Sequence, residues 1–308
     1  MKTVLVTGGA GFIGSHLVDA YVEKGWRVFV VDNLSTGDVR NVNARAELHA
    51  IDVHDAAPLV AKWKPDLISH HAAQVDVRKS VADPAGDAEI NIVASVRLLQ
   101  ACVDAGVKRF IFASSGGAIY GEPVSGPQSE EHPQRPMSPY GCAKLAVEHY
   151  LNYYREVQGL STVAMRYANV YGPRQSTKGE AGVVAIFADR LLRKLPVTIN
   201  GDGSQTRDFV YVGDVVAANM AVSERDDLTG AFNVGTAMET SVNELYDAMS
   251  QINGTHVQAL RGPAKAGEQM RSVLDGRRLR NAAMIATPRA ISDGLKLTID
   301  FFASRRTN

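Results

Sequence analysis

The sequence predicts an α/β protein with a doubly wound parallel sheet and a smaller, discontinuous C-terminal lobe. Three observations carry this prediction. Residues 4–17 read as an apolar strand, a glycine turn and the start of an amphipathic helix. Strand and helix patterns then alternate as far as residue 167, and from Gly172 to Asp208 glycine, proline and charged residues become frequent. We therefore expect a ligand at the carboxyl ends of the strands.

The opening stretch, Val4 to Leu17, contains glycines at positions 8, 11 and 14. Gly8 and Gly11 allow a tight turn and a close approach to a pyrophosphate, and Gly14 allows the helix to pack against the strand. Phe12, Ile13 and Leu17 are expected to face inward. The free N–H groups and the positive end of the helix dipole then favour bound phosphates.

A second apolar strand, Arg27–Val31, ends at Asp32, 18 residues after Gly14. A Rossmann-type fold places the acid that binds the adenosine ribose hydroxyls at about this spacing. Its carboxylate repels a 2′-phosphate, which favours NAD over NADP. The alternative is a turn residue before Asn33.

The remaining elements follow in chain order. We expect strands at 47–51, 65–73, 108–113 and 160–167, and helices at 88–105 and 139–157. In the second lobe we expect a strand at 197–200, a helix entry at 209–222, a strand at 231–235, and helices at 241–252 and 295–304. The domain prediction is an NAD-binding Rossmann domain at 1–172 with a returning piece at about 208–237, and a substrate-binding lobe at 173–207 and 238–308.

Composition narrows the class of protein. The chain has 308 residues, 45% of them hydrophobic, which is enough for a full core. Lys+Arg and Asp+Glu both number 33, so no net charge favours nucleic acid or an anionic membrane. Cys102, Cys142 and the eight histidines show no disulfide or metal-ligand spacing. We expect a soluble cytoplasmic protein without a metal.

The most informative later stretch is Ser138-Pro139-Tyr140-Gly141-Cys142-Ala143-Lys144. Ser138 suits a helix N-cap and Pro139 a first helical position, so Tyr140 and Lys144 lie at i, i+4 on one face. An ammonium near a phenol lowers the pKa of the phenol and makes it a base for a substrate hydroxyl. The alternative is a pair on the helix surface.

Together these motifs resemble an extended short-chain dehydrogenase/reductase, within it most of all the UDP-glucose 4-epimerases and related nucleotide-sugar epimerases. The similarity runs from residue 1 to about 302. It rests on Thr7-Gly8-Gly9-Ala10-Gly11-Phe12-Ile13-Gly14, Asp32-Asn33-Leu34, Asp52-Val53, His71-Ala72-Ala73, Asn91, Tyr120-Gly121, Ser138-Pro139-Tyr140 with Lys144, 166–173 and 207–212.

The resemblance implies a 4-epimerase mechanism. Tyr140, with Lys144 nearby, takes the proton of the sugar 4-hydroxyl while hydride passes from C4 to NAD+, and the 4-keto sugar turns over and takes the hydride back on its other face. The cofactor stays bound between turnovers. The implied cofactor residues are Gly8, Gly11, Phe12, Ile13, Gly14, Asp32, Asn33, Ser35, Thr36, Gly37, Asp52, Val53, Ala72, Ala73, Gln74, Asn91, Ser114, Tyr140, Lys144 and Tyr167.

One position departs from the family pattern. A Ser or Thr that shares a proton with the catalytic tyrosine is expected four residues before Tyr120, where this chain has Gly116. We favour Ser115 for this role, with water as the alternative; its other reading is a strand-end hydrogen bond. The acids of sugar 4,6-dehydratases and nucleotide-sugar decarboxylases are also absent, since Gly117 and Ala118 occupy their positions.

The resemblance also implies a substrate site. Asn169 and Arg207 match diphosphate-binding residues, and Lys265 stands where the family has a second arginine. Ser272 replaces a bulky tyrosine of glucose-specific bacterial epimerases, so UDP-GlcNAc and UDP-GalNAc are expected substrates beside UDP-glucose and UDP-galactose. Val183, Phe187, Val197, Thr198 and Ile199 are expected to line the uridine site, with core packing an equal reading for Val183 and Phe187.

Other readings remain open. A UDP-glucuronate 4-epimerase or another NAD-dependent 4-ketosugar reductase fits the same motifs, and a non-enzymatic NAD sensor is disfavoured by the Tyr140 and Lys144 pair. Residues 88–105 and 139–157 carry the apolar faces that form a four-helix dimer interface in such enzymes, so we expect a homodimer.

Overall fold

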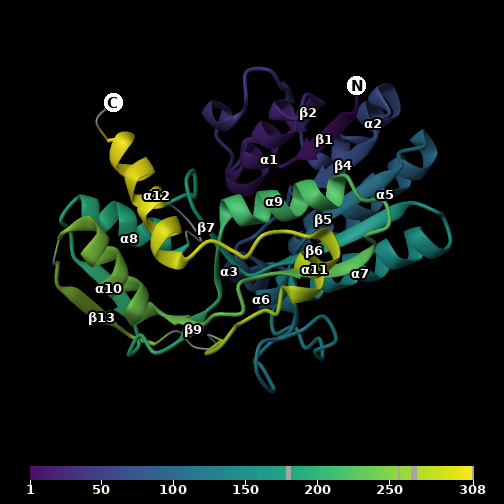
Figure 1. Ribbon diagram of the computed structural model, residues 1–308. Coiled ribbons are helices and arrows are strands. Elements are labelled where there is room, and N and C mark those ends of the chain that lie inside the picture. Colours follow the sequence, from purple (N-terminus) through teal and green to yellow (C-terminus); the bar gives the residue numbers. More distant parts are fainter. Residues whose placement is uncertain (178–181, 256, 265–268, 307–308) are drawn as a thin grey trace.

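The central feature of the computed structural model is a parallel sheet of seven strands in the order β11-β6-β5-β4-β1-β2-β3 (Figure 1). The structure describes residues 1–177, 182–255, 257–264 and 269–306. Chain order reverses on either side of β1, which pairs with both β2 and β4. The predicted doubly wound parallel sheet is therefore confirmed. Its strands are β1 (Thr3–Thr7), β2 (Arg27–Val31), β3 (Glu47–His49), β4 (Leu67–His70), β5 (Arg109–Ser115), β6 (Ser161–Tyr167) and β11 (Gly230–Val234).

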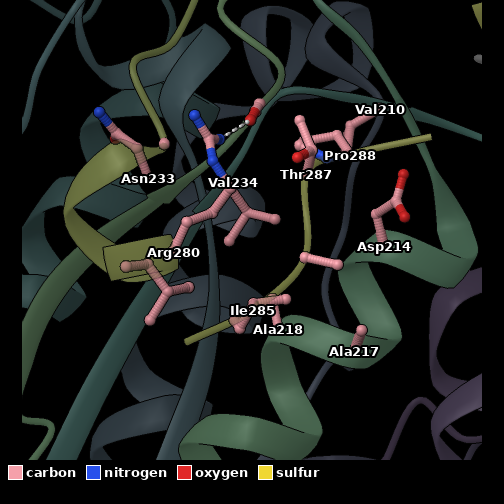
Figure 2. Close-up of a pocket in the computed structure, with 14 residues that line it drawn as sticks. Val210, Asp214, Ala217, Ala218, Asn233, Val234, Arg280, Ile285, Thr287 and Pro288 are labelled. Atoms are coloured by element: carbon pink, nitrogen blue, oxygen red, sulfur yellow. Dashed lines mark hydrogen bonds between the residues drawn. The ribbon is translucent and has the colours of Figure 1, made fainter. Parts of the chain in front are cut away.

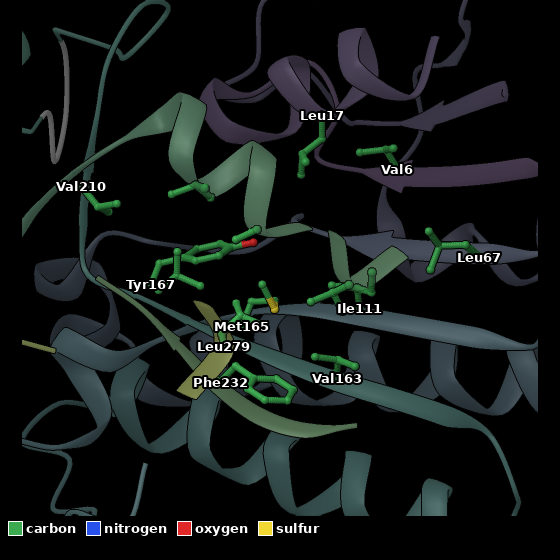
Figure 3. Packing of buried hydrophobic residues seen from close by; sticks show 14 of the residues in the cluster. Val6, Leu17, Leu67, Ile111, Val163, Met165, Tyr167, Val210, Phe232 and Leu279 are labelled. Carbon is green, nitrogen blue, oxygen red and sulfur yellow. The ribbon is translucent and has the colours of Figure 1, made fainter. Parts of the chain in front are cut away.

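Helices cover both faces of this sheet, because strand side chains alternate between the faces. On β1, Val4 and Val6 join one buried cluster and Leu5 joins another. The first cluster packs under α1 (Phe12–Glu23), α9 (Val212–Ser223) and α11 (Arg277–Ala283), and Figure 3 shows part of it. The second packs under α2 (Ala57–Trp63), α5 (Ala94–Ala105) and α7 (Pro139–Glu156).

A second group of elements lies beside one end of the sheet, at the left of Figure 1. It has its own buried cluster, in which Phe187, Leu245 and Leu295 come from three different helices. These helices are α8 (Val183–Leu192), α10 (Val242–Asn253) and α12 (Ile291–Ser304). Three two-stranded sheets accompany them: β8 (Val197–Asn200) with β13 (Ala259–Gly262), β7 (Asn169–Tyr171) with β10 (Phe209–Tyr211), and β9 (Thr206–Arg207) with β12 (Thr240–Ser241).

Several local predictions need correction. Residues 209–222 are not one helix entry, because Phe209–Tyr211 pairs with β7 before α9 begins at Val212. The strand expected at 47–51 stops at His49. Helix α8 was not predicted as an element. Shorter helical turns, also not predicted, are α3 (Val77–Ala82), α6 (Gly116–Ile119), Val39–Asn41 and Val53–Asp55.

The helix expected at 88–105 is built in three parts. It begins as α4 (Pro84–Ala88), with the Asp83 carboxylate accepting the Gly86 N–H, passes through a π-helical turn at Glu89–Val93 and continues as α5. Such turns are rare and occur often at functional sites. Among the described residues, no helix is both long and apolar enough to cross a bilayer.

Candidate active site

The glycine turn between β1 and α1 is shaped by backbone packing. Gly8 has φ +69°, and a Cβ there would stand 2.7 Å from the backbone nitrogen of Ala72. A Cβ at Gly14 would overlap the carbonyl oxygen of Gly8, which supports its predicted role in helix–strand packing. Gly11, the N-cap of α1, makes no side-chain cap, and the first turn carries no acid. The helix N-terminus is therefore suited to an anion such as a diphosphate.

Asp32 lies beside this turn and is 8% exposed. One carboxylate oxygen accepts the N–H of Ala10 at 2.9 Å and the other the N–H of Leu34 at 2.8 Å. A Cβ at Gly37 would stand 2.9 Å from Asp32 Oδ1, so glycine keeps this corner open. Each carboxylate oxygen can accept a further hydrogen bond. The arrangement fits the predicted recognition of ribose hydroxyls.

The adjacent loops come together as the cofactor prediction requires. Asn33 Nδ2 donates to Asp52 Oδ2 at 2.8 Å, and the other oxygen of Asp52 accepts the His54 N–H. Val53 is buried beneath this pair. Ser35 and Thr36 are exposed on the loop that follows Asn33. These side chains thus lie together in the loops beyond β2 and β3.

The loop after β4 is held by a small polar cluster. The Gln74 N–H donates to Asn91 Oδ1 at 3.0 Å, and Asn91 Nδ2 donates back to the Gln74 carbonyl at 2.9 Å. Both side-chain amides also donate to Asp87 Oδ1, each at 2.9 Å. Ala72 and Ala73 lie half-buried just before Gln74. Asp87 was missed from the sequence, although its i, i+4 spacing to Asn91 placed both on one helical face.

Tyr140 and Lys144 lie on the first turns of α7, as predicted. The Ser138 hydroxyl accepts the Gly141 N–H and caps the helix, and Pro139 opens it. Lys144 is 3% exposed; its Nζ donates to the Ala113 carbonyl at 2.8 Å and lies 5.7 Å from the centre of the Tyr140 ring. The phenol and the ammonium therefore sit together at the carboxyl end of β5.

The predicted lowering of the Tyr140 pKa is wrong for this state of the protein. Burial raises the pKa of Tyr140, the charge of Asp87 raises it further, and a hydrogen bond with Ser115 opposes them. Burial lowers the pKa of Lys144 to about 8, while Asp87 and Glu148 pull it upward. Lys144 does not give the expected lowering of the Tyr140 pKa, because its ammonium is directed to a backbone carbonyl instead of the phenol.

Two neighbouring serines have different partners. The Ser115 side chain lowers the pKa of the nearby Tyr140 phenol against the effect of burial, which favours Ser115 over water for the role left vacant by Gly116. The Ser114 hydroxyl donates to Glu148 at 2.5 Å, and Glu148 forms a buried ion pair with Arg166 at 2.6 Å. Ser114, predicted to contact the cofactor, thus uses its hydroxyl in this network.

Two of the predicted substrate residues, Ser272 and Asn169, lie beside Gly117 after β5. A Cβ at Gly117 would stand 3.6 Å from Ser272 Oγ and 3.9 Å from Asn169 Oδ1. Ser272 is 1% exposed and its hydroxyl has no hydrogen-bond partner. Arg207 Nη1 donates to the Thr206 carbonyl at 2.8 Å. Lys265 lies outside the described residues.

The proposed uridine-site residues are divided by burial. Phe187, Val197 and Ile199 are at most 1% exposed in the core of the second lobe, and Val183 packs against that core. Thr198 is exposed on the opposite side of β8. For Phe187, a role in core packing is therefore favoured over a role in the uridine site.

Tyr167, another predicted cofactor residue, is 5% exposed in the first cluster of the sheet. Its hydroxyl donates to Asn219 Oδ1 at 3.0 Å and lies 3.1 Å from His71 Nε2. The side chain is thus held by packing and by these two polar neighbours.

A separate cavity of about 70 Å³ lies between α9, α11 and the segment 285–288, as Figure 2 shows. Ala217, Ala218, Val234 and Ile285 give it an apolar wall, and Arg280 Nη1 donates to the Gly235 carbonyl at its edge. Nucleotide ligands occupy pockets of several hundred Å³. This cavity contains none of the predicted site residues and is too small for such a ligand.

Comparison with known proteins places this geometry in a family. The model of the NAD dependent epimerase/dehydratase family matches residues 4–235. The chain belongs to that family. As a family member it is an enzyme of the extended short-chain dehydrogenase/reductase group. The prediction of NAD as cofactor is thereby confirmed.

Individual relatives match almost the whole length. The UDP-glucose 4-epimerase of Mycolicibacterium smegmatis is 43% identical, with 99% of both chains covered. A UDP-glucose 4-epimerase from Thermotoga maritima, solved with UDP-glucose, is 44% identical with a TM-score of 0.95 and 99% of both chains covered. A Thermus thermophilus UDP-glucose 4-epimerase, solved with NAD, is 43% identical with a TM-score of 0.92, covering 97% of this chain and 98% of that chain.

Proposed function

We propose that this protein is an NAD-dependent UDP-hexose 4-epimerase, which interconverts UDP-glucose and UDP-galactose. The observation that carries the proposal is the cluster of Tyr140, Ser115 and Lys144 at the carboxyl end of β5. Gly117 and Ala118 provide no acid for chemistry at C5 or C6. The named relatives support the same activity.

Tyr140, Ser115 and Lys144 have different roles in the proposed reaction. The Tyr140 phenolic oxygen accepts the proton of the sugar 4-hydroxyl and later returns it to the 4-oxygen, while the hydride returns to the opposite face of C4. Ser115 hydrogen-bonds that oxygen and stabilises its charged form, and Lys144 adds a buried positive charge. NAD, when bound, would supply the hydride acceptor and donor at C4.

The residues that would hold the cofactor come from the first half of the sheet. The N-terminus of α1 receives the diphosphate, Asp32 the adenosine ribose, and the loop of Gln74 and Asn91 lies on the path to Tyr140. A glycine at 37 supports this assignment, since a side chain there would meet the Asp32 carboxylate.

The substrate would lie between the sheet and the second lobe, which we assign to residues 173–207 and 238–308 except α11, because α11 packs on the sheet. We assign the substrate diphosphate to Asn169 and Arg207, as the family resemblance implies. Ser272 and Gly117 lie side by side and are both small where a tyrosine would be bulky, and the hydroxyl of Ser272, which has no hydrogen-bond partner, can bind a polar substituent. This supports turnover of UDP-GlcNAc and UDP-GalNAc in addition to the plain hexoses.

An NMR assay of purified protein without added cofactor tests the proposal. UDP-glucose, UDP-galactose, UDP-GlcNAc, UDP-GalNAc and UDP-glucuronate are incubated separately, with Tyr140→Phe as the inactive variant. We expect C4 interconversion in the wild type and its loss in Tyr140→Phe, with bound NAD retained in both. Turnover of UDP-glucuronate alone, or net oxidation with release of NADH, would replace the proposal with a glucuronate epimerase or a reductase.

We further propose a homodimer through α5 and α7. Exposed apolar side chains support it: Tyr150 and Tyr153 on α7, Val157 just after α7, and Ile90 on the π-helical turn before α5. Sedimentation velocity on wild type and Tyr153→Arg tests it. We expect a dimer that becomes a monomer in the variant; a monomeric wild type would refute it.

A further inference from the structure

The charges behind Tyr140 are not balanced by the ion pair that the structure shows there. Lys144 and Arg166 are both buried, at 3% and 4% exposed. Arg166 is neutralised by Glu148 in a short pair, and Glu148 also accepts the Ser114 hydroxyl. Lys144 donates to a carbonyl oxygen and lies 4.5 Å above the Phe112 ring. A buried ammonium without an anion is costly, so a counter-charge is required nearby.

Asp87 is the side chain placed to supply it. It is 3% exposed and is the buried carboxylate of α4, which packs directly against α7. Its Oδ1 is fixed by the amides of Gln74 and Asn91, whereas its Oδ2 is buried with no hydrogen-bond partner. Asp32 and Asp208, two other buried carboxylates, have both oxygens hydrogen-bonded to backbone N–H groups.

We propose that Asp87 is a positioning residue that sets the ionisation of the Tyr140–Lys144 pair, with its unpaired oxygen serving as the counter-charge that keeps Lys144 protonated. The hydrogen bonds from the Gln74 and Asn91 side-chain amides fix the Asp87 carboxylate and so hold its unpaired oxygen in place. Asp87 thereby links the cofactor loop to the catalytic helix. This inference rests on the proposed function for its kinetic test.

The electrostatic surroundings agree with this role. The groups facing Lys144 are Asp87 from α4, Tyr140 and Glu148 from α7, His70 at the end of β4, and His71 just after it. Burial lowers the pKa values of both histidines, which therefore carry no charge at neutral pH. Asp87 raises the pKa of Lys144 against its burial, and it raises the pKa of Tyr140 as well.

The consequence is a specific signature. Removing one negative charge lowers the pKa of both neighbours, because both the ammonium and the neutral phenol lose the group that favoured the protonated form. In Asp87→Asn, both limbs of the pH profile of kcat/KM should move to lower pH, by about one unit. A merely structural role would reduce the height of the profile without moving its limbs.

A direct test uses protein labelled with [ε-¹³C]lysine, in which the Lys144 signal is assigned by its absence from Lys144→Met. We expect the Lys144 titration midpoint to fall by about one unit in Asp87→Asn. In Asp87→Asn the side chain keeps an oxygen that can accept both hydrogen bonds from the Gln74 and Asn91 amides. Asp87→Ser, which is smaller and also neutral, is the second variant and should give the same shift of the Lys144 midpoint. Glu89→Gln, an exposed neutralisation two residues away, is the matched control and should give none.

An unchanged Lys144 midpoint in both neutral variants overturns the inference. So does an equal shift in Glu89→Gln, because it would indicate a general effect of net charge. A wild-type protein that lacks epimerase activity refutes the proposed function, while the NMR titration still decides the coupling of Asp87 to Lys144.

Discussion

The Leu274 side chain lies directly over Gly116. A Cβ added at residue 116 would overlap Leu274 Cδ1, whereas a Cβ at Gly117 would meet no atom closer than 3.6 Å. Leu274 is fully buried, and its N–H donates to Asp208. The absence of the family hydroxyl at 116 is therefore coupled to a leucine from a distant segment that fills its place.

This relationship predicts that Gly116→Ser does not improve the enzyme. The serine should lower the free energy of unfolding by about 1–3 kcal/mol through overpacking and should reduce kcat. Chemical denaturation and the epimerase assay measure the two effects. Gly117→Ala, where space exists, is the control for folding, and Leu274→Ala in the Gly116→Ser background should recover part of the stability lost to the overlap. A stable and faster Gly116→Ser would contradict this account.

Ser115→Ala should slow the reaction and displace its pH dependence. The Ser115 hydrogen bond lowers the pKa of Tyr140, so its loss raises that pKa and the base form appears only at higher pH. We expect kcat to fall by about tenfold or more, with the acid limb moving to higher pH. This direction is opposite to that expected for Asp87→Asn. Ser114→Ala should instead reduce stability, because its hydroxyl binds the Glu148 carboxylate.

Ser272→Tyr should narrow the range of substrates. The ring would occupy the space beside Gly117, so turnover of UDP-GlcNAc should fall by about 100-fold or more relative to UDP-glucose. Competition assays that follow both sugars in one tube give this ratio directly. Ser272→Ala serves as the control and should keep both activities. If the tyrosine variant kept the wild-type ratio, Ser272 would not control the size of the pocket.

Acidification should destabilise the protein through His71. Burial lowers the pKa of His71 to about 4, while an unfolded histidine takes up a proton near pH 6.5. Between these values the unfolded chain binds more protons, so stability falls as the pH falls. The loss by pH 5 is about 2 kcal/mol.

Urea unfolding at pH 7 and pH 5 measures this loss. His71→Gln should show a smaller difference between the two pH values than the wild type, and His149→Gln, at an exposed position, should behave like the wild type. Equal pH dependence in the wild type and His71→Gln would exclude His71 as the cause.

The fold could be predicted in large part from local sequence. The apolar strand before Gly8, the spacing to Asp32 and the Ser138–Pro139 helix start are short-range signals, and the structure places each of them as expected. The predicted element boundaries were wrong where strands pair with distant parts of the chain. Residues Phe209–Tyr211, for example, form a strand only because β7 lies beside them.

The candidate site was predictable in its residues more than in its electrostatics. Spacing brought Tyr140 and Lys144 together, but it could not show that Lys144 would bind the Ala113 carbonyl, or that burial would raise the pKa of the phenol. Asp87 and Leu274 were missed because their importance depends on which distant elements cover them, and one sequence without its packing carries no sign of that.

The position of β11 has a consequence for how the chain folds as it is synthesised. This strand completes the edge of the sheet beside β6, yet more than sixty residues of the second lobe and α9 separate the two in the chain. Until Val234 has left the ribosome, the edge of β6 and the face beneath α9 remain uncovered. The cofactor-binding part therefore cannot complete its folding before the second lobe is synthesised. A nascent chain halted before Gly230 should need protection by chaperones.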